Sequence, residues 1–173
     1  MPSFRPAVAI DIPALHPLIE SAYRGESARQ GWTHEADLLG GQRTDVQALA
    51  GIIADPMQTL LLMEDVDTLV GCVLVAEKPG PKGYLGMLTV SPSLQGGGFG
   101  RQLIDAAEAH ARDTFDAVTM EMTVIKSRRD LIDWYIRRGY ADTGREEPFP
   151  LDDIRFGLPK TRDLVFAVLA KAL

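Results

Sequence analysis

The stretch LTVSPSLQGGGFGRQLI, residues 88–104, joins a short apolar segment, a proline and three consecutive glycines. After Gly100, apolar residues recur at helical spacing, for example at Leu103, Ala107 and Ala111, which predicts an amphipathic helix. The glycines therefore stand at a helix start. They act either as a flexible hinge or as a cradle for an anion, because a helix start offers unpaired N–H groups and roughly half a positive charge.

Length and composition are those of an ordinary globular protein. The chain has 173 residues, 46% hydrophobic and 24% charged, and we expect a single domain over residues 1–173. No apolar run is long enough to span a bilayer, and the N-terminus lacks the features of a signal peptide, so we expect a cytoplasmic protein. The net charge of −6 argues against broad contact with nucleic acid, and we expect neither a nucleic-acid nor a membrane partner.

Cysteine and histidine usage argues against redox and metal chemistry. The single cysteine, Cys72, lies in the apolar segment VGCVLV and is expected to be a core residue in a reducing compartment. The three histidines, His16, His34 and His110, share no ligand spacing with each other or with Cys72, so no metal site is predicted.

Periodicity and turn signals predict the order of elements in the first half. A helix is expected after Asp11, which can cap it, and a second helix follows Thr44–Gln47, which has the spacing of a capping box. Residues 24–43 between them are expected to form an irregular loop. The further elements are a strand over 3–9, a hairpin of strands 59–65 and 68–77 around Val66-Asp67, and a strand over 84–90.

The second half alternates strands with helices. Residues 117–125 alternate strictly in character, so Val118, Met120, Met122 and Val124 are expected on one face of a strand. A helix over 131–138, a strand from Gly139, a long surface loop over 145–163 and a last strand over 164–173 follow. This order predicts an α/β protein with a sheet of mixed direction and helices on both faces.

Residues 88–140 resemble the GNAT superfamily of acyl-CoA-dependent N-acetyltransferases. LTVSPSLQGGGFGRQLI is similar to the acetyl-CoA signature of that family, with Gln95, Gly98 and Gly100 at the Gln/Arg-x-x-Gly-x-Gly/Ala positions. VIKSRRDLIDWYIRRGY, residues 124–140, is similar to a second family segment that bears a tyrosine, here Tyr135. The resemblance implies a mixed, mostly antiparallel central sheet of about six to seven strands with helices on both faces.

The resemblance also implies acetyl-CoA as co-substrate, with its pyrophosphate on the N–H groups of residues 96–101 and its pantetheine arm along residues 88–90. In many relatives an asparagine near the start of the tyrosine helix contacts the cofactor, whereas this chain has basic residues there, and Arg128 is the candidate replacement. The implied cofactor-binding residues are Leu88, Thr89, Val90, Gln95, Gly96, Gly97, Gly98, Phe99, Gly100, Arg101 and Arg128.

The chemistry that the resemblance implies is direct attack of a neutral amine on the thioester. Tyr135 is the candidate acid for the departing thiolate, because a tyrosine hydroxyl is protonated at neutral pH; its alternative role is that of a core aromatic. Glu121, on the polar face of its strand, and Glu77 are candidate bases, although strand glutamates are commonly solvated or paired.

The acceptor stays open in the sequence. A metabolite, a peptide N-terminus, a lysine side chain and an aminoglycoside are all compatible, and a homodimer is a further expectation because dimers are common among relatives. A CoA-binding sensor without transfer activity is the alternative function, while a nucleotide-binding domain lacks support because no Gly-Lys-Ser/Thr follows the glycines. The residues expected to line the acceptor pocket are Tyr23, Arg24, Trp32, Thr33, His34 and Glu35.

Overall fold

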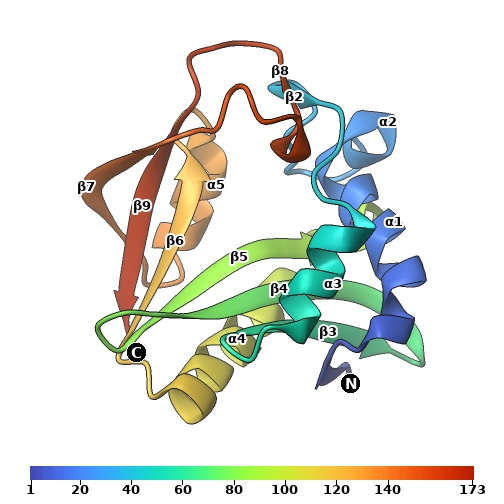
Figure 1. The fold of residues 1–173 in the computed structure, drawn as a ribbon, viewed down its shortest axis with the longest axis vertical. Coiled ribbons are helices and arrows are strands. Elements are labelled where there is room, and N and C mark those ends of the chain that lie inside the picture. Colours follow the sequence, from blue (N-terminus) through green and yellow to red (C-terminus); the bar gives the residue numbers. More distant parts are fainter.

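The computed structural model describes residues 1–173, and a seven-stranded sheet runs through its centre (Figure 1). Neighbouring strands are antiparallel except β5 and β6, which are parallel. This arrangement confirms the predicted mixed, mostly antiparallel sheet. The strand order is β1 (Ser3–Pro6), β3 (Gln58–Asp65), β4 (Thr68–Lys78), β5 (Lys82–Val90), β6 (Thr119–Ile125), β9 (Val165–Ala172) and β7 (Ala141–Pro148).

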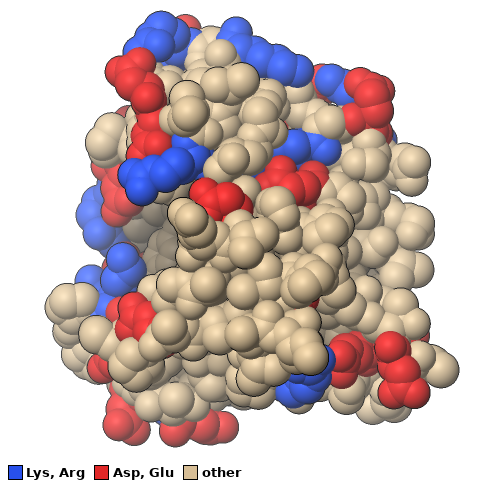
Figure 2. Space-filling model, turned by 45° about the vertical axis from the view of Figure 1, so that its right-hand side comes forward, with Lys and Arg blue, Asp and Glu red and all other residues tan.

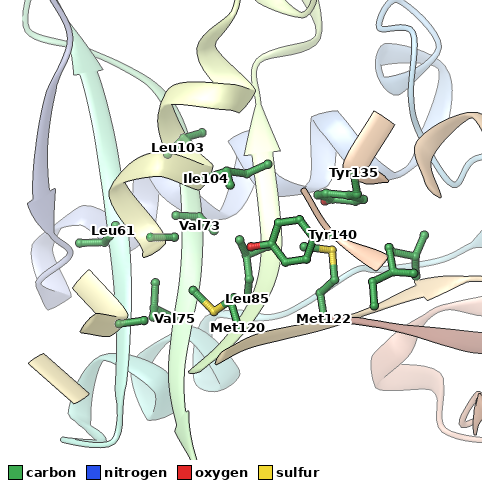
Figure 3. Packing of buried hydrophobic residues seen from close by; sticks show 14 of the residues in the cluster. Leu61, Val73, Val75, Leu85, Leu103, Ile104, Met120, Met122, Tyr135 and Tyr140 are labelled. Atoms are coloured by element: carbon green, nitrogen blue, oxygen red, sulfur yellow. The ribbon is translucent and has the colours of Figure 1, made fainter. Parts of the chain in front are cut away.

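Helices cover both faces of the sheet, as predicted. The reason is visible in β3, where Leu61 and Met63 face one apolar cluster and Leu60 and Leu62 face the other. The first cluster is closed by α4 (Phe99–Phe115) and α5 (Arg129–Ile136), and Figure 3 shows its packing. The second is closed by α1 (Ile12–Tyr23) and α3 (Val46–Ala54). None of the helices combines the length and apolar character that a membrane span requires.

The hairpin of β3 and β4 confirms the sequence interpretation. Its two loop residues, Val66 and Asp67, have φ of 47° and 59°, which are the left-handed angles of a type I′ turn. Cys72 on β4 is fully buried, and burial raises the pKa of its thiol to about 12, so it is a core residue as expected.

The helix starts are placed correctly, but their caps differ from the expectation. Asp45, not Thr44, caps α3, because its carboxylate accepts a hydrogen bond from the Ala48 N–H at 2.7 Å. Asp11 precedes α1 without capping it; its carboxylate binds the Arg5 guanidinium at 2.9 Å instead. At Asp11 the Arg5 guanidinium of β1 decides the partner, which the spacing of a helix start does not show, whereas at α3 the cap is simply one residue later than expected.

Two segments expected to be irregular contain more structure. Residues 24–43 include α2 (Gly25–Ala28) and β2 (Leu39–Gly40), and β2 pairs with β8 (Leu158–Pro159). The predicted start of the loop over 145–163 is wrong, because β7 continues to Pro148 along β9. Most residues of the remainder are exposed or half-exposed, as a surface loop predicts, but Phe149 is buried against Leu39 and Ile125. Val118 is exposed, so the buried face of β6 begins only at Met120.

The sheet opens between β5 and β6. Parallel pairing is confined to Lys82–Tyr84 and Thr119–Glu121, and the two strands are unpaired beyond that point. A bulge contributes, because Met87 and Leu88 together face Val73, and Met87 adopts a left-handed φ of 51°. Strained backbone at a non-glycine residue is typical of functional sites, so the opening is a candidate site.

Gly71 tests how tightly β4 and β5 approach beside this opening. A Cβ at Gly71 would lie 2.6 Å from the Thr89 carbonyl oxygen, so Gly71→Ala is expected to destabilise the protein by about 1–3 kcal/mol. The matched control is Gly51→Ala in the exposed interior of α3, where the Cβ meets no atom within 4 Å and a gain of about 0.5–1 kcal/mol is expected. Chemical denaturation measures both; equal effects of the two substitutions would contradict the close approach.

Candidate active site

The glycine loop is an ordered turn that leads into α4. Gly96 and Gly98 have φ of 88° and 84°, the left-handed region that favours glycine, and Gly98 is the N-cap of the helix. No side chain caps α4, so the N–H groups of its first turn stay available to a ligand. Gly96 and Gly98 are therefore explained by the left-handed backbone angles of this turn, and not by a need for a flexible hinge.

A cavity lies against this helix start, and its charge is one-sided. Three arginines line it, Arg101, Arg128 and Arg138, and no aspartate or glutamate does. This is notable in a chain with a net charge of −6. Together with the helix dipole, the arginines create a positive potential that suits an anionic ligand.

Arg138 was not among the residues predicted to bind cofactor. Its guanidinium lies 3.6 Å from the centre of the Trp134 ring, and Nη1 donates to the Trp134 carbonyl oxygen at 2.7 Å. Nε is buried without a partner. Burial, with the nearby charges of Arg137 and Arg101, lowers the pKa of Arg138. The signal was present in Arg-Arg-Gly-Tyr, but only the fold shows which arginine turns inward.

The open edge of β5 forms a second wall of the cavity. The Leu88 carbonyl accepts a hydrogen bond from the Tyr23 hydroxyl at 2.7 Å, and the Val90 carbonyl accepts one from Gln95 Nε2 at 3.3 Å. Both carbonyls therefore point into the opening and not toward β4. Thr89, between them, is buried and its hydroxyl donates to the Met87 carbonyl. The structure brings Leu88 and Val90 to the cavity but turns the side chain of Thr89 away.

Tyr135 lies at the inner end of the cavity. It is 6% exposed, and its ring packs edge-on against Trp134 and Tyr140, with ring centres 5.0 and 6.0 Å away. Figure 3 shows Tyr135 beside Tyr140. Its hydroxyl makes no hydrogen bond with the chain. Burial raises its pKa well above the usual value, so the phenol is protonated at neutral pH.

A larger cavity of about 590 Å³ lies on the other side of Tyr135. The shared wall of the two cavities consists of Tyr23, Leu88, Arg128, Leu131 and Tyr135. The two cavities therefore adjoin at the point where β5 and β6 separate. Two adjoining cavities, one cationic and one mostly apolar, could hold two different ligands side by side.

Residues 15–140 match the family model described as the acetyltransferase (GNAT) family. The chain belongs to the GNAT acetyltransferase family. The match spans both the glycine loop and Tyr135, which confirms the resemblance found in the sequence.

Known proteins similar to this GNAT acetyltransferase include an IAA acetyltransferase of Azospirillum brasilense, which is 30% identical over 110 residues, 62% of this chain and 71% of the relative. The structure of an IAA acetyltransferase from Bacillus cereus has a TM-score of 0.69 at 13% identity over both full chains. The structure of YncA, a putative acetyltransferase from Salmonella typhimurium with its cofactor acetyl-CoA, has a TM-score of 0.71 at 15% identity, covering 100% of this chain and 94% of YncA. At these identities the two structures show a shared fold.

The predicted cofactor residues of this GNAT acetyltransferase fall into two groups. Gly97 and Phe99 belong to the loop and the first helical turn without lining the cavity, and Thr89 is turned away, as described above. The residues that the structure does bring to the cavity are Leu88, Val90, Gln95, Gly96, Gly98, Gly100, Arg101 and Arg128.

Arg128 has a second task in the GNAT acetyltransferase. Its Nη2 donates to the Thr33 hydroxyl at 2.5 Å, and its Nη1 pairs with the Glu35 carboxylate at 3.4 Å. The same loop contacts the opposite wall, because Trp32 packs on Trp134 with ring centres 5.9 Å apart. The Arg128 charge is therefore partly neutralised by Glu35, and the Arg128 contacts help to hold residues 32–35 over the cavity.

The candidate bases of the GNAT acetyltransferase do not reach either cavity. Glu121 pairs with Lys82 and Arg145, each at 3.0 Å, and lines a neighbouring hollow. Burial alone would raise the pKa of Glu121, but its bonds to Lys82 and Arg145 outweigh burial and lower it. Glu77 is exposed near the end of β4. The alternation of residues correctly predicted the face of β6 on which Glu121 lies. It could not show that Lys82 of β5 and Arg145 of β7 form ion pairs with Glu121.

The residues expected around the acceptor divide between the two cavities. Trp32, Thr33 and His34 line only the cationic cavity, whereas Arg24 and Glu35 line only the larger one. The reason is that the chain crosses between the cavities at this loop. The larger cavity also uses Phe149, Phe156 and Phe166 from the end of the chain, which the sequence placed in a surface loop or the last strand.

Proposed function

We propose that this acetyltransferase transfers an acetyl group from acetyl-CoA to a primary amine by direct attack. The observation that carries the proposal is the cationic cavity, where three arginines and no carboxylate surround an uncapped helix start with a left-handed glycine. Acetyl-CoA is a polyanion with a long flexible arm, and the cavity continues from the helix start to the open edge of β5. The larger cavity beyond Tyr135 then receives the amine.

The donor is held at two places. The N–H groups at the start of α4, with Arg101 and Arg138, bind the pyrophosphate through charge-assisted hydrogen bonds. The Leu88 and Val90 carbonyls accept hydrogen bonds from the amide groups of the pantetheine arm, in exchange for those of Tyr23 and Gln95. This arrangement brings the thioester to the wall that both cavities share.

Chemistry takes place at that wall. The amine nitrogen forms a bond to the thioester carbon, and a backbone N–H of residues 88–90 stabilises the negative oxygen of the tetrahedral adduct. The carbon–sulfur bond then breaks, and the Tyr135 hydroxyl donates its proton to the thiolate. A hydroxyl with no partner in the chain is free to reach the sulfur.

The amine must lose a proton before or during attack. Glu35 and Glu147 are the carboxylates that line the larger cavity. Glu35 is held by Arg24 at 2.5 Å and by Arg128, whereas Glu147 makes no ion pair. We therefore assign the base to Glu147 acting through water, in place of Glu121.

Two measurements test the proposal in sequence. Isothermal titration with acetyl-CoA, NADH and ATP is expected to give the tightest binding for acetyl-CoA. Release of free thiol is then followed with a coloured thiol reagent over a panel of amines, and the buried Cys72 thiol adds no background. Binding of acetyl-CoA without thiol release on any amine would favour a sensor. Preference for NADH or ATP would contradict the proposal.

A further inference from the structure

The guanidinium of Arg43 lines the larger cavity and has no acidic partner. No carboxylate lies within ion-pair distance of it, and its side chain makes no hydrogen bond with the chain. It lies over the Tyr23 ring, 5.0 Å from the ring centre. Tyr23 in turn binds the Leu88 carbonyl, so Arg43 is one aromatic ring away from the open edge of β5.

The backbone fixes the position of Arg43. The Glu20 carboxylate on α1 accepts hydrogen bonds from the Arg43 N–H at 2.9 and 3.0 Å and from the Thr44 N–H at 2.8 Å. The side chain therefore leaves from an anchored point, and it is half-buried. An anionic ligand that binds such a cation loses little binding free energy, because no ion pair has to be broken and the backbone of the residue is already held in place.

Charge in this cavity favours an anion. Its cations are Arg24, Arg43, Lys78 and Arg128, and its carboxylates are Glu35 and Glu147. Glu35 is bound by Arg24 and Arg128, whose charges it partly neutralises. In addition, Nε of Arg24 is buried without a partner. In Figure 2, lysine and arginine side chains lie along the left-hand edge of the molecule beside a shaded hollow, interspersed with aspartate and glutamate side chains.

The rest of the lining is apolar and aromatic. Thirteen of its 22 residues are hydrophobic, and Tyr84, Phe149, Phe156 and Phe166 supply rings. Pockets of this kind bind ligands through apolar area and use a few polar groups to orient them. An acceptor that fills the cavity therefore needs an apolar group in addition to its amine.

We propose that the acceptor is an amino acid with an apolar side chain, whose carboxylate binds Arg43, whose side chain packs on the phenylalanine rings, and whose amine faces Tyr135. This inference rests on the proposed function and deepens it. A polyamine fits less well, because it would place a second cation beside Arg43 and Lys78.

The test compares acceptors that differ in charge. With acetyl-CoA saturating, kcat/KM is measured for L-phenylalanine, for L-phenylalaninamide, which keeps the shape but lacks the negative charge, and for spermidine. L-Phenylalanine is expected to exceed the amide by about tenfold or more, because a charge-assisted hydrogen bond to Arg43 is lost in the amide. Spermidine is expected to be the poorest of the three.

Variants assign the preference to Arg43. Arg43→Gln is expected to lower the ratio of kcat/KM for L-phenylalanine to that for the amide by about tenfold or more, and Arg43→Lys is expected to retain part of it. Arg162→Gln is the matched control, because Arg162 is exposed and pairs with Asp152 on the surface. It should keep the wild-type ratio. Thermal unfolding establishes that each variant is folded; if Arg43→Gln is not, the wild-type ratio decides.

The outcomes separate the two levels of the proposal. Acetylation of the amide or of spermidine in preference to L-phenylalanine would overturn the amino-acid inference and leave the amine acetyltransferase intact. A ratio unchanged in Arg43→Gln would likewise overturn the assignment to Arg43. Absence of transfer to every amine, with acetyl-CoA bound, would overturn both.

Discussion

Replacement of Tyr135 by phenylalanine is expected to lower kcat by about 10²–10⁴ while binding of acetyl-CoA is retained. The substitution keeps the ring, its edge-on contacts with Trp134 and Tyr140, and its burial. It removes only the hydroxyl, which has no partner in the chain, so stability should change little. The thiolate then leaves without a proton donor, and its departure becomes slow.

Tyr140→Phe is the matched control for this substitution. Tyr140 is a buried neighbour in the same cluster (Figure 3), but its hydroxyl donates to the Glu108 carboxylate at 3.0 Å, away from the cavities. Loss of this hydroxyl should cost about 1–3 kcal/mol of stability, because the buried Glu108 carboxylate then keeps only Lys171 as a partner. It should leave kcat unchanged, because Tyr140 lines neither cavity.

The two tyrosines thus make opposite predictions for rate and for stability. Steady-state kinetics at saturating acetyl-CoA, with a rapid-mixing experiment to establish that chemistry limits turnover, measures the first. Chemical denaturation measures the second. An unchanged kcat in Tyr135→Phe would assign the proton to water and reduce Tyr135 to a core aromatic.

The second large effect is expected from Arg138→Gln. The guanidinium turns into the cationic cavity, and its Nε is buried without a partner. Loss of a charge-assisted hydrogen bond of about 1.5–3 kcal/mol raises the Kd for acetyl-CoA by about 10- to 150-fold. The dependence of log Kd on salt should also become shallower, because one cation fewer contacts the phosphates.

Arg137→Gln is the control, since Arg137 is the adjacent arginine of the same helix end and is exposed. Titration calorimetry at two salt concentrations is expected to show near wild-type affinity for it. Arg138→Lys separates charge from shape, because lysine keeps the cation but cannot stack on Trp134. Equal effects at positions 137 and 138 would show that only the overall charge matters.

Much of the fold was accessible from local pattern. The β3–β4 hairpin, the glycine loop at the start of α4 and the last strand follow from periodicity and turn chemistry, which act over a few residues. The caps of α1 and α3 show the limit. Asp11 took Arg5 of β1 as its partner once the chain had folded, whereas α3 is capped locally by Asp45, one residue after the expected Thr44.

The sequence by itself determined the chemistry available to the first cavity. A strand and an uncapped glycine turn at a helix start follow one another in residues 88–104, with Arg101 in the first helical turn, whereas Arg128 and Arg138 lie at the two ends of the later helix α5. Tyr135 was likewise found from the segment around it. Which of two neighbouring arginines faces the cavity was not determined, because that depends on the helix phase against the sheet.

Only the tertiary structure decided the second cavity. Arg43, Glu35 and Phe156 are separated by up to 121 residues in the chain, and they meet because β8 pairs with β2 and carries the end of the chain over the N-terminal loop. The same long-range packing gave Glu121 two cationic partners outside the cavities. A binding surface made of distant segments depends on how helices and strands pack, and local sequence pattern carries no record of that packing.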